Sequence, residues 1–261
     1  MQITLVSCIV GTVKGLAQLR DVVYLVCHRS STILRFNATT HQRLTDIRVK
    51  GLRSPRDIVA CEQTSQLYIA DFLQCVWRVS TDGADIKLWL PKSPLETFEP
   101  TKLSVTSTRL LVTSRNTNQL MQFDAIGDEL RRVQLLDCMR PQHAVETPTG
   151  TFIISYHNTQ LKQDQVSEVN TDGKVLRQFT GSHLSLGRPQ HVAVDSRGNV
   201  FVAGAYSHCI LLLDAQLTLR RCIDEHQLNY KEPSRLCYRE QSGQLLVGCS
   251  GGVALFDVLH H

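Results

Sequence analysis

The stretch RPQHVAVDSRGNVFVAGAYSHCILLLD, residues 188–214, opens with four letters that stand a second time in the chain, at residues 140–143. Three further segments also begin with a proline followed by apolar residues. The five prolines are Pro55, Pro100, Pro141, Pro189 and Pro233, at intervals of 45, 41, 48 and 44 residues. A nearly constant interval of this length is typical of a repeat protein.

Each copy of the repeat predicts short strands and no helix. The segment HVAVDSRGNVFVAG at 191–204 reads as two strands around a polar turn, and glycines at the same turn (Gly150, Gly198, Gly243) supply the positive φ that a tight loop needs. An apolar third strand follows, as in CILLLD at 209–214, and then a more polar fourth strand, as in TLRRCI at 218–223. Four antiparallel strands about every 45 residues indicate a blade of a β-propeller.

The count of copies predicts an all-β, six-bladed propeller made of four-stranded antiparallel blades. The blades begin near Val13 and near the five prolines, so that residues 1–261 form one domain. The last copy ends after its third strand, whereas QITLVSCI at 2–9 precedes the first blade as an orphan strand. We expect residues 1–10 to supply the missing strand and close the ring, because closure removes exposed sheet edges.

Composition narrows the class of protein. A net charge of +4 and 42% apolar residues are ordinary for a globular chain. No apolar run approaches the ~20 residues of a membrane span, and no basic, signal-like segment opens the chain. The nine cysteines form no CxxC pair, which favours reduced thiols. These features predict a cytoplasmic protein with no membrane partner.

The repeat chemistry resembles the NHL family of propellers. The fifth blade matches its pattern best, the second matches in part, and the third carries an Asn at the position that gives the family part of its name. The matching residues are Pro189, Val192, Ala193, Val194, Asp195, Gly198, Ser207, His208, Cys209 and Ile210; Pro55, Ile58, Val59, Ala60, Tyr68, Ile69, Ala70 and Asp71; and Asn118, Gln119 and Leu120. The fourth blade departs from it, since polar residues at 161–165 interrupt the third strand.

The resemblance implies a function in recognition. NHL propellers are familiar as C-terminal modules of tripartite-motif ubiquitin ligases, and several bind single-stranded or hairpin RNA. The cysteine patterns of RING and B-box domains are absent from this sequence. The resemblance therefore implies a non-catalytic domain that recognises a substrate or an RNA for a ligase-like protein.

One face of the propeller concentrates positive charge. This loop face consists of the segments that lead into each blade and the loops that join second to third strands. Ten basic and four acidic residues lie on it by position, so the face carries +6 and the rest of the chain −2. Cations beside aromatic rings are how single strands are bound without strict sequence preference. The candidate binding residues are Arg29, Arg56, Phe72, Lys102, Arg115, Asn118, His143, Tyr156, His157, His191, Tyr206 and Arg235.

Other uses of this face stay open from sequence. Arginines and aromatic rings also serve protein partners, so an acidic or extended peptide is the alternative ligand. We expect RNA binding to need an exposed ring at Phe72, Tyr156 or Tyr206 within reach of at least two basic side chains.

A metal-dependent lyase or lactonase is a remote alternative. His143 and His191 begin first strands of adjacent blades, but Asp57, Lys102 and Arg235 occupy the equivalent positions, and cations there oppose a metal. The sequence thus predicts no catalytic residue, metal, cofactor or small-molecule substrate.

Overall fold

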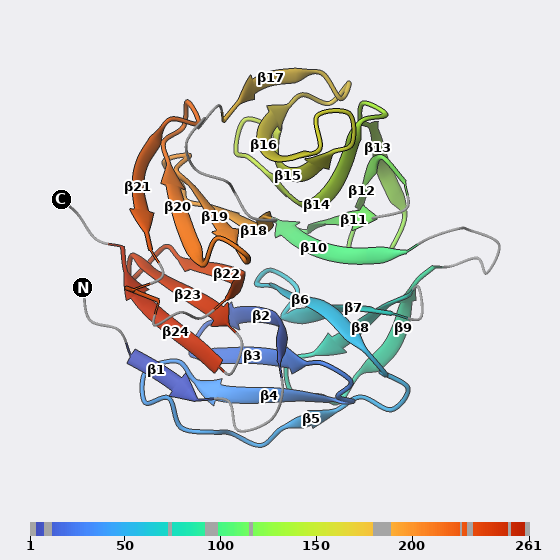
Figure 1. The fold of residues 1–261 in the computed structure, drawn as a ribbon. Coiled ribbons are helices and arrows are strands. Elements are labelled where there is room, and N and C mark those ends of the chain that lie inside the picture. The colour runs from blue at the N-terminus through green and yellow to red at the C-terminus, as the bar shows by residue number, and fades with distance from the viewer. Residues whose placement is uncertain are drawn as a thin grey trace.

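A computed structural model confirms six four-stranded antiparallel sheets arranged as a ring (Figure 1). It describes residues 4–7, 12–72, 75–91, 99–114, 117–179, 189–224, 226–228, 232–249 and 252–258. No helix within these ranges is long and apolar enough to cross a membrane.

Every blade runs from an inner strand beside the central axis to an outer strand at the rim (Figure 1). Blade 1 contains β2 (Val13–Leu19), β3 (Val22–Cys27), β4 (Thr32–Asn37) and β5 (Ile47–Arg48); blade 2 contains β6 (Pro55–Cys61), β7 (Gln66–Asp71), β8 (Cys75–Ser80) and β9 (Ile86–Leu90); blade 3 contains β10 (Pro100–Thr106), β11 (Arg109–Ser114), β12 (Gln119–Phe123) and β13 (Glu129–Gln134). Blade 4 contains β14 (Met139–Glu146), β15 (Phe152–Asn158), β16 (Gln163–Val169) and β17 (Val175–Gln178); blade 5 contains β18 (Pro189–Val194), β19 (Val200–Gly204), β20 (Cys209–Leu213) and β21 (Leu219–Ile223); blade 6 contains β22 (Pro233–Arg239), β23 (Gln244–Cys249), β24 (Gly252–Asp257) and β1 (Thr4–Ser7).

The first strand of the chain closes the ring, as the sequence predicts. β1 pairs antiparallel with β24, from Thr4 opposite Leu255 to Ser7 opposite Gly252. Blade 6 is therefore built from both ends of the described chain, which lie side by side in Figure 1. This pairing covers the edge that β24 would otherwise expose.

Apolar residues fill the space between neighbouring blades. One cluster joins Val26 and Ile33 of blade 1 to Ile58 and Leu67 of blade 2, and equivalent clusters recur around the ring. The middle strands are buried along most of their length, whereas the outer β13 is mostly exposed. This difference explains why the fourth strand of each copy is the most polar in sequence.

Blade 4 is more regular than its sequence predicts. The polar residues at 163–165 do not interrupt its third strand, because β16 pairs with β15 over seven consecutive positions from Gln163 to Val169. Its inner strand also begins at Met139, two residues before the proline. No cysteine in the described ranges forms a disulfide, in line with reduced thiols.

Candidate functional site at the mouth of the central channel

A β-bulge near the start of each inner strand positions the site. The pairing register of every inner strand shifts near its start, directly after Val13, Pro55, Pro100, Pro141, Pro189 and Pro233. A bulge re-aims the side chain that follows it. Six equivalent positions result, which we call the axial ring: Gly15, Asp57, Lys102, His143, His191 and Arg235.

Asp57 is the buried carboxylate of the axial ring. It accepts backbone hydrogen bonds from Ile58 and Leu103, both 3.1 Å long. The guanidinium Nε of Arg235 lies 3.5 Å from its Oδ1 atom. The charge of Asp57 is thus compensated by two amides and one cation, as a buried carboxylate requires.

Arg235 reaches across blade 1 toward blade 2. Its guanidinium donates to the carbonyl oxygens of Lys14 and Ser234, and at 2.8 Å to that of Arg56. Gly15 allows the inner strands of blades 1 and 2 to approach closely here, since a Cβ there would lie 2.5 Å from the backbone nitrogen of Ile58. Arg235 is only 5% exposed, so it braces the channel rather than presenting a surface charge.

Lys102 is a buried cation with few partners. It is 7% exposed, and its ammonium makes one hydrogen bond of 3.5 Å, to the carbonyl oxygen of Arg56. Burial lowers the pKa of Lys102 well below its usual 10.5, and the positive charge of Arg235 lowers it further. A lysine ammonium can donate three hydrogen bonds, so the described residues leave this group under-satisfied.

His143 and His191 stack in parallel, with ring centroids 3.7 Å apart. His143 accepts the amide of Val192 at Nδ1 and bonds the carbonyl of Leu103 through Nε2, both at 3.1 Å, which fixes the tautomer with the proton on Nε2. Burial lowers the pKa of His143 to about 4. Burial, and then His143, lower the pKa of His191 well below 6.5. Both rings are therefore neutral at physiological pH.

The axial ring contains a possible metal triad that sequence spacing did not reveal. Asp57, His143 and His191 place one ligand atom each within 4.8 Å of one another, so Asp57 adds a third ligand atom beside the two imidazoles. Both ring nitrogens of His143 are engaged by the backbone, however. Lys102 and Arg235 also add positive charge beside the triad. These residues fit a divalent cation poorly.

An exposed aromatic ring lies beside the axial ring, on the loop face. Phe72 is 54% exposed, and the guanidinium carbon of Arg56 lies 4.7 Å from the centre of its ring. The neighbouring Asp71 is fully buried and accepts the backbone amides of Arg53, Ser54 and Phe72. Asp71 therefore forms no ion pair with the arginines of this face that the structure describes.

Three cationic side chains, Lys14, Arg29 and Arg56, form a cationic rim at the channel mouth around the imidazole of His28. The positive charges of Lys14, Arg29 and Arg56 all act on His28, whose pKa is lowered by desolvation first and by these cations next. Desolvation lowers the pKa of Lys14, and Arg235 and Arg56 then contribute. His28 and Arg29 are exposed. The rim thus gathers the basic residues of blades 1 and 2 into one patch.

Several predicted binding residues lie elsewhere. Of the three rings of which at least one was expected to be exposed, Tyr156 is not, because it is 2% exposed and bonds Ser167 within blade 4. Lys102, His143, His191 and Arg235 lie inside the channel and not on the surface. Lys102 and Arg235, two of the ten basic residues expected on the loop face, are therefore not surface cations.

The remaining candidates are scattered around the ring. His157 is half-buried and lies 2.8 Å from Asp164, whereas Asn118 donates to the carbonyl of Asp137. Tyr206 is 62% exposed, on blade 5. Arg115 lies outside the described residues. The exposed ring of Phe72 directly meets a predicted arginine, Arg56.

Beyond the histidine pair the channel becomes apolar. A cavity of about 280 Å³ lies there, walled by Ile58, Leu103, Val192, Leu236 and their neighbours, with His143 and His191 among its lining residues. We call it the apolar cavity. Sequence analysis missed it, although the alternation of apolar residues along each inner strand was the available signal.

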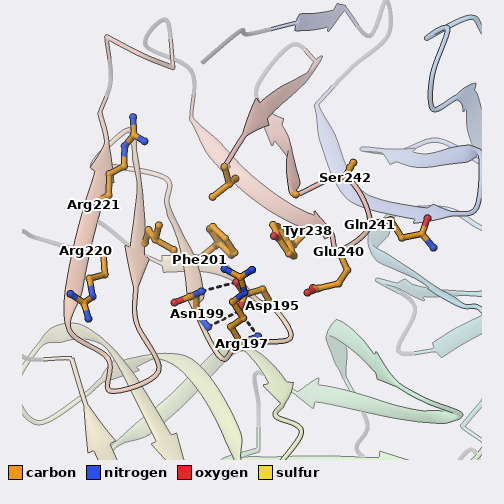
Figure 2. A pocket seen from close by; sticks show the side chains of 13 residues that line it. Asp195, Arg197, Asn199, Phe201, Arg220, Arg221, Tyr238, Glu240, Gln241 and Ser242 are labelled. Atoms are coloured by element: carbon orange, nitrogen blue, oxygen red, sulfur yellow. Dashed lines mark hydrogen bonds between the residues drawn. The ribbon is translucent and has the colours of Figure 1, made fainter. Parts of the chain in front are cut away.

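A second hollow, the blade groove, lies between blades 5 and 6 and has a volume of about 630 Å³. Figure 2 shows Phe201 and Tyr238 facing each other at its centre, and their rings stack 5.1 Å apart. Arg197, Arg220 and Arg221 line it, but Arg220 pairs with Asp214. The groove is formed by the turns at the opposite ends of the inner strands from the loop face.

Known proteins resemble the chain in fold. The sequence matches no protein-family model and no curated protein. A streptogramin B lyase structure aligns with a TM-score of 0.72 at 9% identity, over 97% of this chain and 96% of that one. Hydrazine synthase of Kuenenia stuttgartiensis aligns with 0.69 at 13% identity, over 94% and 83%. The WD40 β-propeller domain of Doa1 aligns with 0.67 at 14% identity, over 94% and 92%.

These similarities establish the propeller fold. Identities of this size carry no information about activity. Two of the neighbours are named as enzymes and one as a WD40 domain, so the fold is shared by catalytic and non-catalytic proteins. The function has to be argued from the site itself.

Proposed function

We propose that this propeller is a non-catalytic recognition domain of a cytoplasmic protein and that its loop face binds single-stranded RNA. The observation that carries the proposal is the pair formed by Arg56 and the exposed ring of Phe72, within a rim of further cations. A nucleic acid base can stack on such a ring or on a guanidinium plane, while neighbouring cations contact phosphates.

The distribution of acidic residues supports the same function. Asp57 and Asp71 belong to the loop face by sequence, yet both carboxylates are buried and bonded to backbone amides. Arg29 and Arg56 consequently keep their charge for a ligand. In the tripartite-motif setting implied by the NHL resemblance, the domain would select the RNA or substrate while other domains act on it.

Fluorescence anisotropy with labelled oligoribonucleotides tests the proposal. We expect log K to fall linearly with log salt, by about 0.7 for each phosphate neutralised. Phe72→Ala should weaken binding by about 1–3 kcal/mol through loss of a stacking surface. Replacement of Arg29 and Arg56 by Glu should abolish binding.

The matched control is the double replacement of Arg197 and Arg221 by Glu, which changes charge equally in the blade groove. It should leave the affinity within about threefold, apart from a small general electrostatic effect. Equal losses in both double variants would show non-specific attraction and refute a site at Phe72. Binding of Glu-rich peptides without RNA binding would assign the face to a protein partner instead.

A further inference from the structure

The buried part of the loop face carries unbalanced positive charge. Four cationic side chains, Lys14, Arg56, Lys102 and Arg235, act on one another around the single carboxylate of Asp57. Glu232 is the further acidic group that acts on this cluster, and it is exposed at the rim. Like charges this close destabilise the fold unless an anion compensates them.

Unused hydrogen-bond donors accompany this charge. Within the described residues, Lys102 makes one bond of 3.5 Å, and the Nε of Arg56 is buried without any partner. The ammonium of Lys14 forms no hydrogen bond to a described residue, although Lys14 is only half-buried. Buried polar groups in native proteins are nearly always bonded, so these donors indicate a missing acceptor.

The position of the donors relative to one carbonyl defines where that acceptor lies. Lys102 and Arg235 both donate to the carbonyl oxygen of Arg56, which brings the two cations together at the inner end of the rim. Lys14 and Arg56 extend from there to the surface, since both are partly exposed. A ligand that approaches from the loop face would meet these two side chains before the buried ammonium.

We infer that the channel mouth is an oxyanion site, in which Lys102, Arg56 and Lys14 bind a phosphate group above the axial ring. Phosphate fits better than a carboxylate because it offers more acceptor oxygens and up to two negative charges to several converging donors. Arg235 holds its backbone carbonyls and takes no direct part. The inference rests on the proposed function only in that RNA supplies the phosphate; inorganic phosphate is the simplest probe.

Two measurements distinguish a phosphate group of RNA from free inorganic phosphate as the ligand. A single-stranded RNA with a 5′-phosphate should bind more tightly than the same strand with a 5′-hydroxyl if its terminus enters the site. Equal binding of the two strands, together with tight binding of inorganic phosphate, would indicate a free phosphate ligand. Both results support an oxyanion site, and they assign it to different ligands.

Lys102→Met is the decisive variant, because Met keeps the length of the side chain and removes its charge. Titration calorimetry and thermal melts should be run with inorganic phosphate, against chloride at equal ionic strength. We expect phosphate to raise the Tm of the unmodified chain. The variant should melt a few degrees higher than the unmodified chain without phosphate, and its phosphate affinity should fall at least about tenfold.

Arg56→Gln provides a second variant at a half-exposed position, in case Lys102→Met fails to fold. It should also weaken phosphate binding, whereas Arg197→Gln in the blade groove should not. No phosphate response in the unmodified chain, or an equal response in all variants, would overturn the inference. A response to acetate or Glu-rich peptides with none to phosphate would overturn it too.

The two proposals can fail separately. RNA binding that survives Lys102→Met, with no phosphate response in the unmodified chain, would leave the RNA function and remove the oxyanion site. Phosphate binding that depends on Lys102, with no RNA binding at any salt concentration, would do the reverse.

Discussion

The two ends of the central channel differ sharply, although the same six strands line both. At the loop face the axial ring contains an acid, two basic groups and a pair of imidazoles. Past the histidine stack, the walls of the apolar cavity are mainly aliphatic. A step of one or two residues along an inner strand therefore changes the channel from charged to apolar.

This difference shows which positions of an inner strand can differ chemically from blade to blade. Positions deeper in each strand, such as Ile58 and Leu103, are 1% exposed and must pack against neighbouring blades. The residue after each bulge faces the equivalent residues of the other blades instead, so its side chain has to be compatible mainly with those residues. Packing between blades thus restricts the residues deeper in each inner strand, whereas the residue after each bulge determines the chemistry of the site.

Asp57→Ala should have the largest effect on the charged end. Removing the carboxylate leaves Arg235 and Lys102 uncompensated in a buried site, which costs about 3–5 kcal/mol. Urea denaturation measures the free energy of unfolding. Asp85→Ala is the matched control, because its ion pairs with Arg78 and Lys87 are exposed and worth about 1 kcal/mol or less. Similar losses in both variants would mean that the axial carboxylate has no special role.

Acid should lower the free energy of unfolding through His143, which lies between the charged end and the apolar end of the channel. The unfolded chain binds protons at the ordinary histidine pKa near 6.5, while burial keeps the folded-state pKa of His143 at about 4. The free energy of unfolding should therefore fall as pH drops from 6.5 to 4, by about 3 kcal/mol from this residue. In His143→Gln the fall over this window should be shallower. An unchanged slope would show that His143 does not titrate in this way.

Val59→Ala should have the smallest effect, at the apolar end. Val59 is half-buried and already borders open space in the cavity, so we expect a loss of about 1 kcal/mol or less. The same urea titration measures it. A loss as large as that of Asp57→Ala would mean that the cavity wall is packed as tightly as the axial ring, contrary to the comparison.

The fold was predictable because its signals are local and repeated. Prolines such as Pro55 and Pro233 mark the inner strands to the residue, and the turn glycines mark the hairpins. Blade 4 shows the limit of such reading. The polar residues of β16 predicted an interrupted strand. Pairing with β15 outweighs their weak preference for conformations other than a strand.

The site was predictable only as a set of positions. Sequence spacing identified Asp57, His143, His191 and Arg235 as equivalent, and they do meet. Spacing does not reveal how far a bulge turns a side chain inward, so Lys102 and Arg235 were taken for surface cations. Tyr156 is likewise buried and bonded to Ser167 on the third strand of its blade, a partner that periodicity alone does not specify.

Ring closure has a consequence for how the protein is made. Among the described strands of this domain, Thr4–Ser7 is synthesised before the others, and its partner, Gly252–Asp257, is synthesised after them. Five blades can form from local hairpins during translation, whereas the ring itself must wait for nearly the whole chain. Until then the first strand has no sheet to join, and a chain that stops early keeps open edges that chaperones and proteases can detect. Closure of the disc thus depends on the strand of the domain that is made last.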